Sequence, residues 1–160
     1  MNRARPILRP LLIYNRLMNI YLDIDGVIVN NKSNKAANYP DEFIEYLLSH
    51  YPDSTYWLTT HCQGDAERAV NDIKQYFEEK TVELLRKIKP TNWLESSNKT
   101  AAIDFTKPFL WFDDNCFYGE KQELVENGVF NNWIKVDLQS DPNVLLKYIH
   151  DFPLPFENIS

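Results

Sequence analysis

Short apolar runs that end in polar residues are the feature of this sequence that most restricts its fold. Residues 19–24 read NIYLDI, which is apolar, β-branched and aromatic, and the run leads into Asp25-Gly26. Such a run is typical of a buried strand that enters a tight turn. Residues 40–50 instead place apolar side chains at helical spacing, behind Pro40 and two acidic residues. Strands that alternate with helices predict an α/β fold with a mostly parallel sheet.

Both patterns recur along the chain. Helix boundaries carry their usual signals, with Pro142 in the first turn of the last segment and Asn127-Gly128 behind an earlier one. We therefore expect a doubly wound, Rossmann-like sheet flanked by helices, with at most a minimal cap. The expected strands are residues 19–24, 54–59, 108–112 and 133–136, and the expected helices are residues 40–50, 65–77, 81–88, 97–105, 120–126 and 142–150.

The length and composition indicate one globular domain. The chain has 160 residues, of which 44% are hydrophobic and 25% charged, so a disordered or collagenous chain is excluded. No apolar run is long enough to span a bilayer, and we expect no membrane partner. The two cysteines, Cys62 and Cys116, are too few for a disulfide framework, which favours a reducing, cytoplasmic location.

The first seventeen residues differ from the rest in charge. They hold four arginines and no acidic residue. Because the net charge of the whole chain is −6, the remaining residues carry a net charge of −10. A targeting peptide fits the arginines but not the lack of serine, and no cleavage site indicates a secretory signal. We favour a disordered or non-native N-terminal extension over residues 1–17, with Met18 as the natural start, and a single domain over residues 18–160.

The acidic body bears on possible partners. Non-specific binding to duplex nucleic acid needs many Lys and Arg contacts, so a nucleic-acid partner is not favoured, although it is not excluded. A phosphorylated substrate is compatible with the charge, because a bound divalent cation inverts the local sign of a site. The sequence indicates no oligomeric state.

Polar side chains follow three of the expected strands. Ligands of open parallel sheets bind at the carboxyl ends of the strands, so we expect these side chains to meet. Several carboxylates at one edge repel one another unless a hard cation such as Mg²⁺ joins them. Each residue taken alone is explained equally well as a turn or cap residue. The residues are Asp23 and Asp25, Thr59 and Thr60, and Asp113 and Asp114.

The order of these motifs resembles the haloacid dehalogenase (HAD) superfamily, over residues 18–150. Its members are mostly Mg²⁺-dependent phosphatases and phosphotransferases. The matching motifs are Asp23-Ile24-Asp25-Gly26-Val27 after a strand, Thr59 after the apolar residues 56–58, Lys99 before a helix, and residues 109–114 (FLWFDD). A receiver domain also uses acids, a Thr and a Lys around Mg²⁺, but it places them in a different order.

The resemblance implies a role for each motif. Asp23 would be the nucleophile that forms an aspartyl-phosphate, and Asp25 the general acid and base. Gly26 would let the backbone approach the ligand. Mg²⁺ would sit between Asp23, the backbone carbonyl of Asp25, and Asp113. Asp114 would either bind Mg²⁺ itself or contact one of its ligands.

The remaining assignments leave alternatives open. Thr59 would bind a phosphate oxygen, and Thr60 replaces it if the strand ends one residue later. Lys99 would offset charge on the transferring phosphoryl group, with Lys87, Lys89 and Lys107 as nearby competitors.

His61, Cys62 and the four tryptophans are interpreted as structural or substrate-lining residues. The segments after the first and second motifs are too short for a cap domain, so we expect an open site. The polar residues 30–38 are candidates for a small flap over it. An open site suits a small phosphorylated molecule or a phosphate that protrudes from a macromolecule. The alternative function is a regulatory or non-catalytic protein that binds phosphate or metal.

Overall fold

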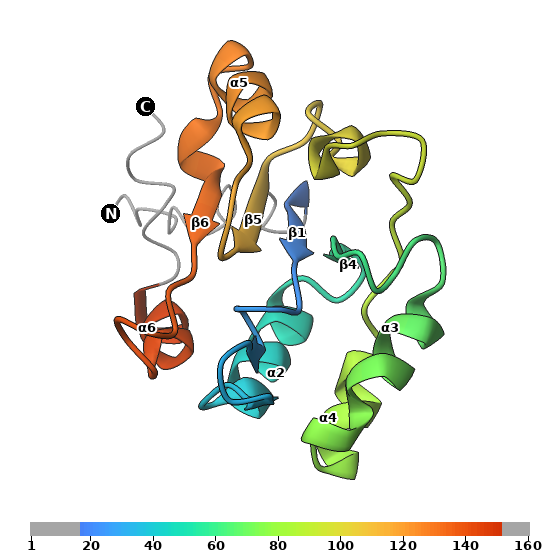
Figure 1. Ribbon diagram of the computed structural model, residues 1–160, viewed down its shortest axis with the longest axis vertical. Helices are drawn as coiled ribbons and strands as arrows, with labels where there is room; N and C mark the ends of the chain where they lie inside the picture. The colour runs from blue at the N-terminus through green and yellow to red at the C-terminus, as the bar shows by residue number, and fades with distance from the viewer. Residues whose placement is uncertain (1–16, 152–160) are drawn as a thin grey trace, which may run out of the picture.

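The structure, a computed structural model, describes residues 17–151 (Figure 1). The expectation for residues 1–17 therefore lies outside the described residues, apart from Leu17. Four parallel strands lie side by side in the order β4-β1-β5-β6, which confirms the predicted parallel sheet. The strands are β1 (Asn19–Leu22), β4 (Thr55–Trp57), β5 (Phe109–Asp113) and β6 (Trp133–Lys135).

Helices lie between and after these strands, as the alternation predicted. The expected helix over residues 40–50 is observed with those bounds, and the others differ by a few residues at their ends, where boundaries are least determined by local sequence. The α-helices are α2 (Pro40–His50), α3 (Ala66–Ile73), α4 (Glu79–Leu85), α5 (Tyr118–Glu126) and α6 (Val144–Asp151).

Two expected helices are shorter than predicted. The helix over residues 65–77 ends at Ile73, whose φ of −121° leaves the helical region, and continues only as the 3₁₀ turn η1 (Lys74–Tyr76). The helix over residues 97–105 is the 3₁₀ helix η2 (Lys99–Ala102), which has extended backbone on both sides. A further 3₁₀ turn, η3 (Phe130–Asn132), precedes β6. Short 3₁₀ segments of this kind commonly act as connectors.

The predicted polar loop over residues 30–38 contains a small antiparallel pair. Strands β2 (Val29–Asn30) and β3 (Lys35–Ala36) pair around a turn in which Asn34 has a φ of 51°. The Asn30 side chain accepts hydrogen bonds from the backbone N–H groups of Lys32 and Ser33. The segment is therefore a hairpin and is too small to form a domain of its own.

Both faces of the main sheet are covered, which is the layering that a doubly wound sheet requires. Alternate residues of β1 and β5 point to opposite faces, so Ile20 and Phe112 belong to one buried cluster and Tyr21 and Trp111 to the other. The larger cluster includes side chains of α2, α3, α4 and α6, and α2 packs against both α4 and α6. The smaller cluster includes Leu124 of α5.

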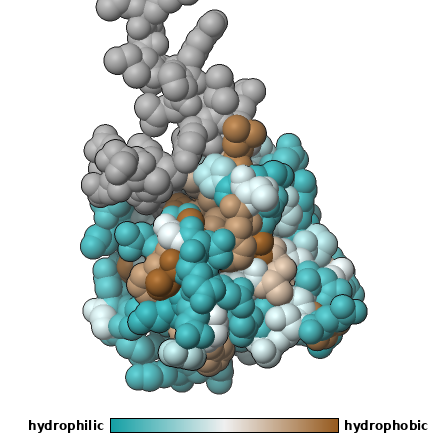
Figure 2. Space-filling model, turned by 90° about the horizontal axis from the view of Figure 1, so that it is seen from above, coloured by the Kyte–Doolittle hydropathy of each residue, from teal (hydrophilic) through white to brown (hydrophobic). Residues whose placement is uncertain are grey.

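The surface of the described part of the chain is mainly hydrophilic. The visible part of the face in Figure 2 is largely hydrophilic, and its hydrophobic side chains form separate small patches. Among residues 17–151, no helix combines the length and the apolar character that crossing a bilayer would require.

We expect Phe43→Ala to lower the free energy of unfolding by about 3–5 kcal/mol, because truncation of a buried aromatic residue leaves a cavity. Phe43 is fully buried and its ring packs edge-on against Phe112, with centroids 5.4 Å apart. The matched control is Val125→Ala on α5, which is 56% exposed and should change stability by less than about 0.5 kcal/mol. Urea unfolding monitored by circular dichroism measures both, and equal losses would contradict the assignment of the core.

Candidate active site at the carboxyl edge of the sheet

The direction in which the chain adds strands to the sheet reverses between β1 and β5. Strand β1 pairs with β4 on one side and with β5 on the other, so the connections leave their carboxyl ends toward opposite edges. In open parallel sheets, ligands bind in the crevice at this point. Asp23 directly follows β1, and Asp113 is the last residue of β5. The two carboxylates therefore lie where the topology favours a ligand.

A lysine joins these two carboxylates. The Nζ atom of Lys99 lies 3.2 Å from Oδ2 of Asp23 and 2.6 Å from Oδ2 of Asp113. Asp23 and Asp113 are 5% and 1% exposed, so the three charges are held away from water. The alternation of β1 and β5 explains the contact, because Asp23 follows Tyr21 and Asp113 follows Trp111 by two residues on the face that η2 covers.

The site carries more negative charge than Lys99 can neutralise. Burial and the neighbouring Asp23 raise the pKa of Asp113 to about 8, against the opposing effect of Lys99. Burial also raises the pKa of Asp23, again opposed by Lys99. Burial alone would lower the pKa of Lys99, but the two carboxylates outweigh it and raise that pKa. A second positive charge would let both carboxylates ionise at neutral pH.

Lys99 reaches the carboxylates because a buried glutamate fixes the start of η2. The Glu120 carboxylate of α5 accepts hydrogen bonds from the backbone N–H of Lys99, at 2.8 Å, and from that of Phe117, at 2.9 Å. Of the competing lysines, Lys89 donates to the carbonyl of Asp53 and Lys107 lies 3.8 Å from Asp104. The structure thus brings Lys99 to the acidic edge, as the sequence interpretation preferred.

Three carboxylates could hold a cation together. One oxygen each from Asp23, Asp113 and Asp114 lies within 4.8 Å of the others. All three donors are hard carboxylate oxygens, which are the ligands that Mg²⁺ prefers, so the chemistry of the donors fits this cation. Gly26 has a φ of 78°, and a Cβ at this position would collide with the Asp114 carboxylate. The turn after β1 therefore needs glycine at position 26 for two reasons: the positive φ, and the space that the Asp114 carboxylate occupies.

The Asp25 side chain lies outside this cluster, and the metal ligand expected at this residue is its backbone carbonyl. Its Oδ2 atom is 2.9 Å from Nε2 of His61, and Nδ1 of the same ring is 2.9 Å from Oδ2 of Asp72 on α3. Burial alone would lower the pKa of His61, but hydrogen bonds to Asp72 and Asp25 raise it above its usual value. Only the backbone carbonyl of Asp25, which the resemblance implies as a ligand, is left for that role.

The two threonines after β4 differ in environment. Thr59 is fully buried, whereas Thr60 is exposed. The Thr59 hydroxyl oxygen accepts a hydrogen bond from the backbone N–H of His61 at 3.4 Å, which leaves the hydroxyl hydrogen available to a ligand. Cys62 is buried, and burial raises its thiol pKa, so it is a poor nucleophile at neutral pH. Both cysteines are free.

Sequence reasoning missed three contacts at this edge. Trp111 donates its indole N–H to Oδ2 of Asp113 at 3.1 Å, and strand alternation was the signal that places these two residues on one face. The signal for Glu120 was its place three residues after Phe117, where a glutamate can bond to the helix start. The contact between His61 and Asp25 had no local signal, because it joins two separate strand ends.

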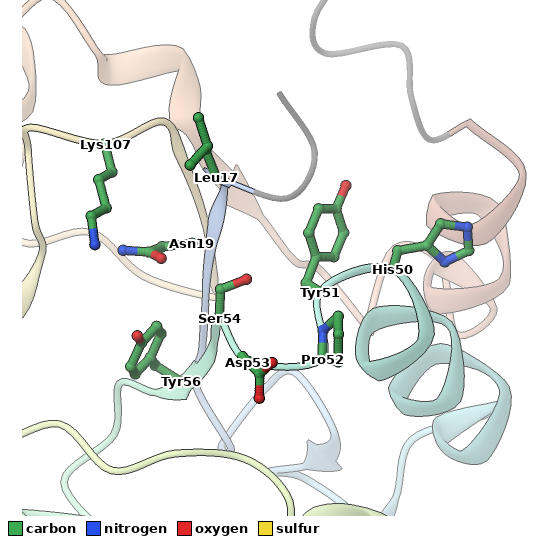
Figure 3. A pocket seen from close by; sticks show the side chains of 9 residues that line it. All are labelled: Leu17, Asn19, His50, Tyr51, Pro52, Asp53, Ser54, Tyr56 and Lys107. Carbon is green, nitrogen blue, oxygen red and sulfur yellow. The ribbon is translucent and has the colours of Figure 1, made fainter. Parts of the chain in front are cut away.

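Two cavities of the described part of the chain lie at opposite ends of the sheet. One cavity of about 470 Å³ includes Asn19 at the start of β1 in its lining (Figure 3). Asp23 is four residues further along, about 13 Å at the rise of an extended strand, so this cavity is remote from the carboxylates. A second cavity of about 300 Å³ borders Gly26 and Asp114 and extends beneath Lys32 and Lys135. This cavity leaves room for a ligand beside the acidic edge.

We expect the melting temperature of the metal-free protein to fall as the pH rises from about 5 to about 9. The pKa of Asp113 is about 8 in the folded protein and about 3.9 in an unfolded chain, so the folded state keeps a proton that the unfolded state has lost. The resulting stabilisation is lost as the pH rises through about 8, and Mg²⁺ should restore it. The raised pKa values of Asp23 and His61 act in the same direction.

The control variant is Asp113→Asn, which is neutral at every pH and should therefore show a shallower decline. Differential scanning calorimetry with and without Mg²⁺ measures both proteins. A melting temperature that rises with pH in the metal-free wild type would contradict the assignment.

We expect Gly128→Ala to destabilise the fold by about 1 kcal/mol or more and Gly26→Ala to destabilise it further. Both glycines have positive φ values, 70° and 78°, but only a Cβ at Gly26 also collides with Asp114. Only Gly26→Ala should also lose the stabilisation by Mg²⁺, because its Cβ displaces Asp114, whereas no atom lies within 4 Å of a Cβ at Gly128. Thermal shifts with added Mg²⁺ compare the two variants, and an equal response to Mg²⁺ would count against Asp114 in the cation site.

Comparison with known proteins supplies no relative. Protein-family models, curated proteins and solved structures were compared with the chain, and none of them matches it. The features that bear on function are the parallel sheet and the side chains at its carboxyl edge. One group holds Asp23, Lys99, Asp113 and Asp114, and the other holds Asp25, Thr59 and His61.

Proposed function

We propose that this chain is a Mg²⁺-dependent phosphohydrolase of the HAD type, which hydrolyses a phosphomonoester through an aspartyl-phosphate on Asp23. The observation that carries the proposal is the buried contact of Lys99 with both Asp23 and Asp113 at the reversal point of the sheet. The four motifs of the HAD resemblance are far apart in the sequence and lie close together at this edge. A surface salt bridge would need neither this burial nor this topology.

In the first step, a carboxylate oxygen of Asp23 attacks phosphorus. The new bond joins Asp23 to phosphorus while the bond from phosphorus to the leaving oxygen breaks, and protonated Asp25 gives its proton to that oxygen. The Lys99 ammonium offsets the negative charge that spreads over the phosphoryl oxygens. Thr59 donates its hydroxyl hydrogen to one of these oxygens.

In the second step, the Asp25 carboxylate takes a proton from water as the water oxygen attacks phosphorus. The bond between Asp23 and phosphorus then breaks, inorganic phosphate leaves, and Asp23 and Asp25 return to their starting states. One residue serves as acid and then as base because the first step leaves it deprotonated.

Asp23, Asp113 and Asp114 would hold Mg²⁺, with the Asp25 carbonyl as a further oxygen donor. When bound, the cation neutralises charge on the transferring phosphoryl group. Lys99 supplies one positive charge to two buried carboxylates, so one negative charge remains when both are ionised. The residues fit Mg²⁺ because the cation would compensate this remaining charge.

The surroundings of the site favour an accessible phosphate. The hairpin of β2 and β3 is attached beside it, with the Asn31 amide 3.4 Å from Asp114 and the Gln139 amide 3.2 Å from Asn30. The 300 Å³ cavity next to Gly26 and Asp114 can take a leaving group. A small phosphorylated molecule, or a phosphate that protrudes from a macromolecule, suits this arrangement.

We expect the wild type to exchange the oxygen atoms of ¹⁸O-labelled inorganic phosphate with water in the presence of Mg²⁺, because formation and hydrolysis of the aspartyl-phosphate are reversible. This assay needs no knowledge of the substrate. Asp23→Asn should lower the exchange by more than about a thousandfold, since it removes the nucleophile. Mass spectrometry of the phosphate measures the exchange.

The control is Asp53→Asn, an acidic residue at the opposite cavity, which should exchange at the wild-type rate. Hydrolysis of 4-nitrophenyl phosphate by the same variants provides a second measurement. Stabilisation of the wild type by Mg²⁺ with neither exchange nor hydrolysis would instead indicate the non-catalytic phosphate- or metal-binding protein. Exchange that survives in Asp23→Asn would show that Asp23 is not the nucleophile.

A further inference from the structure

The His61 ring lies between two carboxylates. Its Nε2 atom is 2.9 Å from Asp25, and its Nδ1 atom is 2.9 Å from Asp72. Asp25 follows β1, His61 follows β4 and Asp72 lies on α3, so the chain of contacts joins three separate elements. The ring is 28% exposed and the carboxylates of Asp25 and Asp72 are 52% and 41% exposed, so the three side chains lie at the surface of the site.

Hydrogen-bond chemistry matches the ring to both neighbours. An imidazolium ring has two N–H donors, and each carboxylate accepts one of them. When Asp25 instead carries a proton on its other carboxyl oxygen, Oδ2 still accepts from the N–H at Nε2 while the N–H at Nδ1 donates to Asp72, so that proton stays free for transfer. The contact between Asp25 and His61 is therefore satisfied in both states that an acid and base must visit.

The turn that carries His61 is held firmly by backbone hydrogen bonds. The N–H of Cys62 donates to the carbonyl of Thr59 at 3.2 Å, and the N–H of Gly64 donates to that of Thr91 at 2.7 Å. Asp65 then caps α3 by accepting from the N–H of Arg68. Because the turn leads directly into α3, the ring and Asp72 are presented by one continuous, ordered segment.

Asp25 needs such a partner more than Asp23 does. Its side chain lies outside the carboxylate cluster and is half exposed, so water alone would leave it free to rotate among its rotamers. Proton transfer requires the carboxylate to be about 2.6–3.2 Å from the leaving oxygen. A misplacement of about 1 Å can lower the rate about a hundredfold.

We propose that His61 is a positioning residue that holds the Asp25 carboxylate for proton transfer, and that Asp72 fixes the orientation of the His61 ring. The inference rests on the proposed phosphohydrolase function. It adds to that function the residues that position the proton donor, His61 after β4 and Asp72 on α3. Asp72 then plays the part that a carboxylate commonly plays behind a functional histidine.

Two substrates of similar shape separate this role from a general structural one. The leaving group of phenyl phosphate is basic and needs a proton, whereas that of 4-nitrophenyl phosphate needs little help. We expect His61→Ala to lower kcat/KM about 10- to 100-fold for phenyl phosphate and less than about threefold for 4-nitrophenyl phosphate. The value of kcat/KM reports the step in which the leaving group departs, so it isolates Asp25 as the acid.

Two further variants keep the test independent of folding. His61→Gln retains an N–H donor toward Asp25 and should recover part of the activity on phenyl phosphate. Asp72→Asn should show the same selective loss in weaker form. The matched control is His50→Ala, an exposed histidine at the end of α2 whose Nδ1 atom lies 2.9 Å from the carbonyl oxygen of Tyr46, and it should leave both substrates unaffected.

The possible failures are distinguishable. If His61→Ala loses equal activity on both substrates, or loses none, while Asp23→Asn abolishes turnover, the role of His61 is overturned and the proposed function stands. If the wild type hydrolyses neither substrate and does not exchange phosphate oxygens, the proposed function is refuted, and the role of His61 with it. A selective loss on phenyl phosphate that His61→Gln partly reverses would support the positioning role.

Discussion

The acidic edge of the sheet depends on one buried ammonium group. An unpaired carboxylate in a buried position costs several kcal/mol, and Asp23 and Asp113 are both buried. Lys99 contacts both and makes their burial possible, with Glu120 holding the lysine in place. When both carboxylates are ionised, the one positive charge of Lys99 leaves a net negative charge at this edge, which a bound cation would neutralise. Burial and the charge of Asp23 raise the pKa of Asp113 against the effect of Lys99, and Asp114 adds a further carboxylate nearby.

The order of the strands divides the edge into two regions with different chemistry. On the β5 side, Asp113 and Asp114 lie with Lys99, and this region concentrates charge. On the β4 side, His61 connects Asp25 to Asp72, and this region is suited to the movement of protons. Asp23 lies on the central strand between them. Under the proposed function, Asp23 would attack phosphorus with the cation on one side and the proton donor on the other.

Local patterns predicted the elements best where several signals agreed. Helix α2 has the predicted bounds because Pro40, two acidic residues and an apolar face all indicate the same segment. The segment around Lys99 formed only a short 3₁₀ helix, since its start depends on the bond to Glu120 and not on its own sequence. The resemblance implied the backbone carbonyl of Asp25 as a metal ligand, whereas nothing in the local sequence indicated that its side chain contacts His61.

The sequence by itself determined that acids and threonines follow buried strands, because hydrophobic periodicity and turn residues act over a few neighbouring positions. It therefore predicted the parallel sheet and the meeting of Asp23 with Asp113. Only the tertiary structure decided which side chains touch there: Trp111 with Asp113, Glu120 with the start of η2, and His61 with Asp25 and Asp72. Such contacts depend on the packing of whole helices against the sheet, to which residues distant in the chain contribute together.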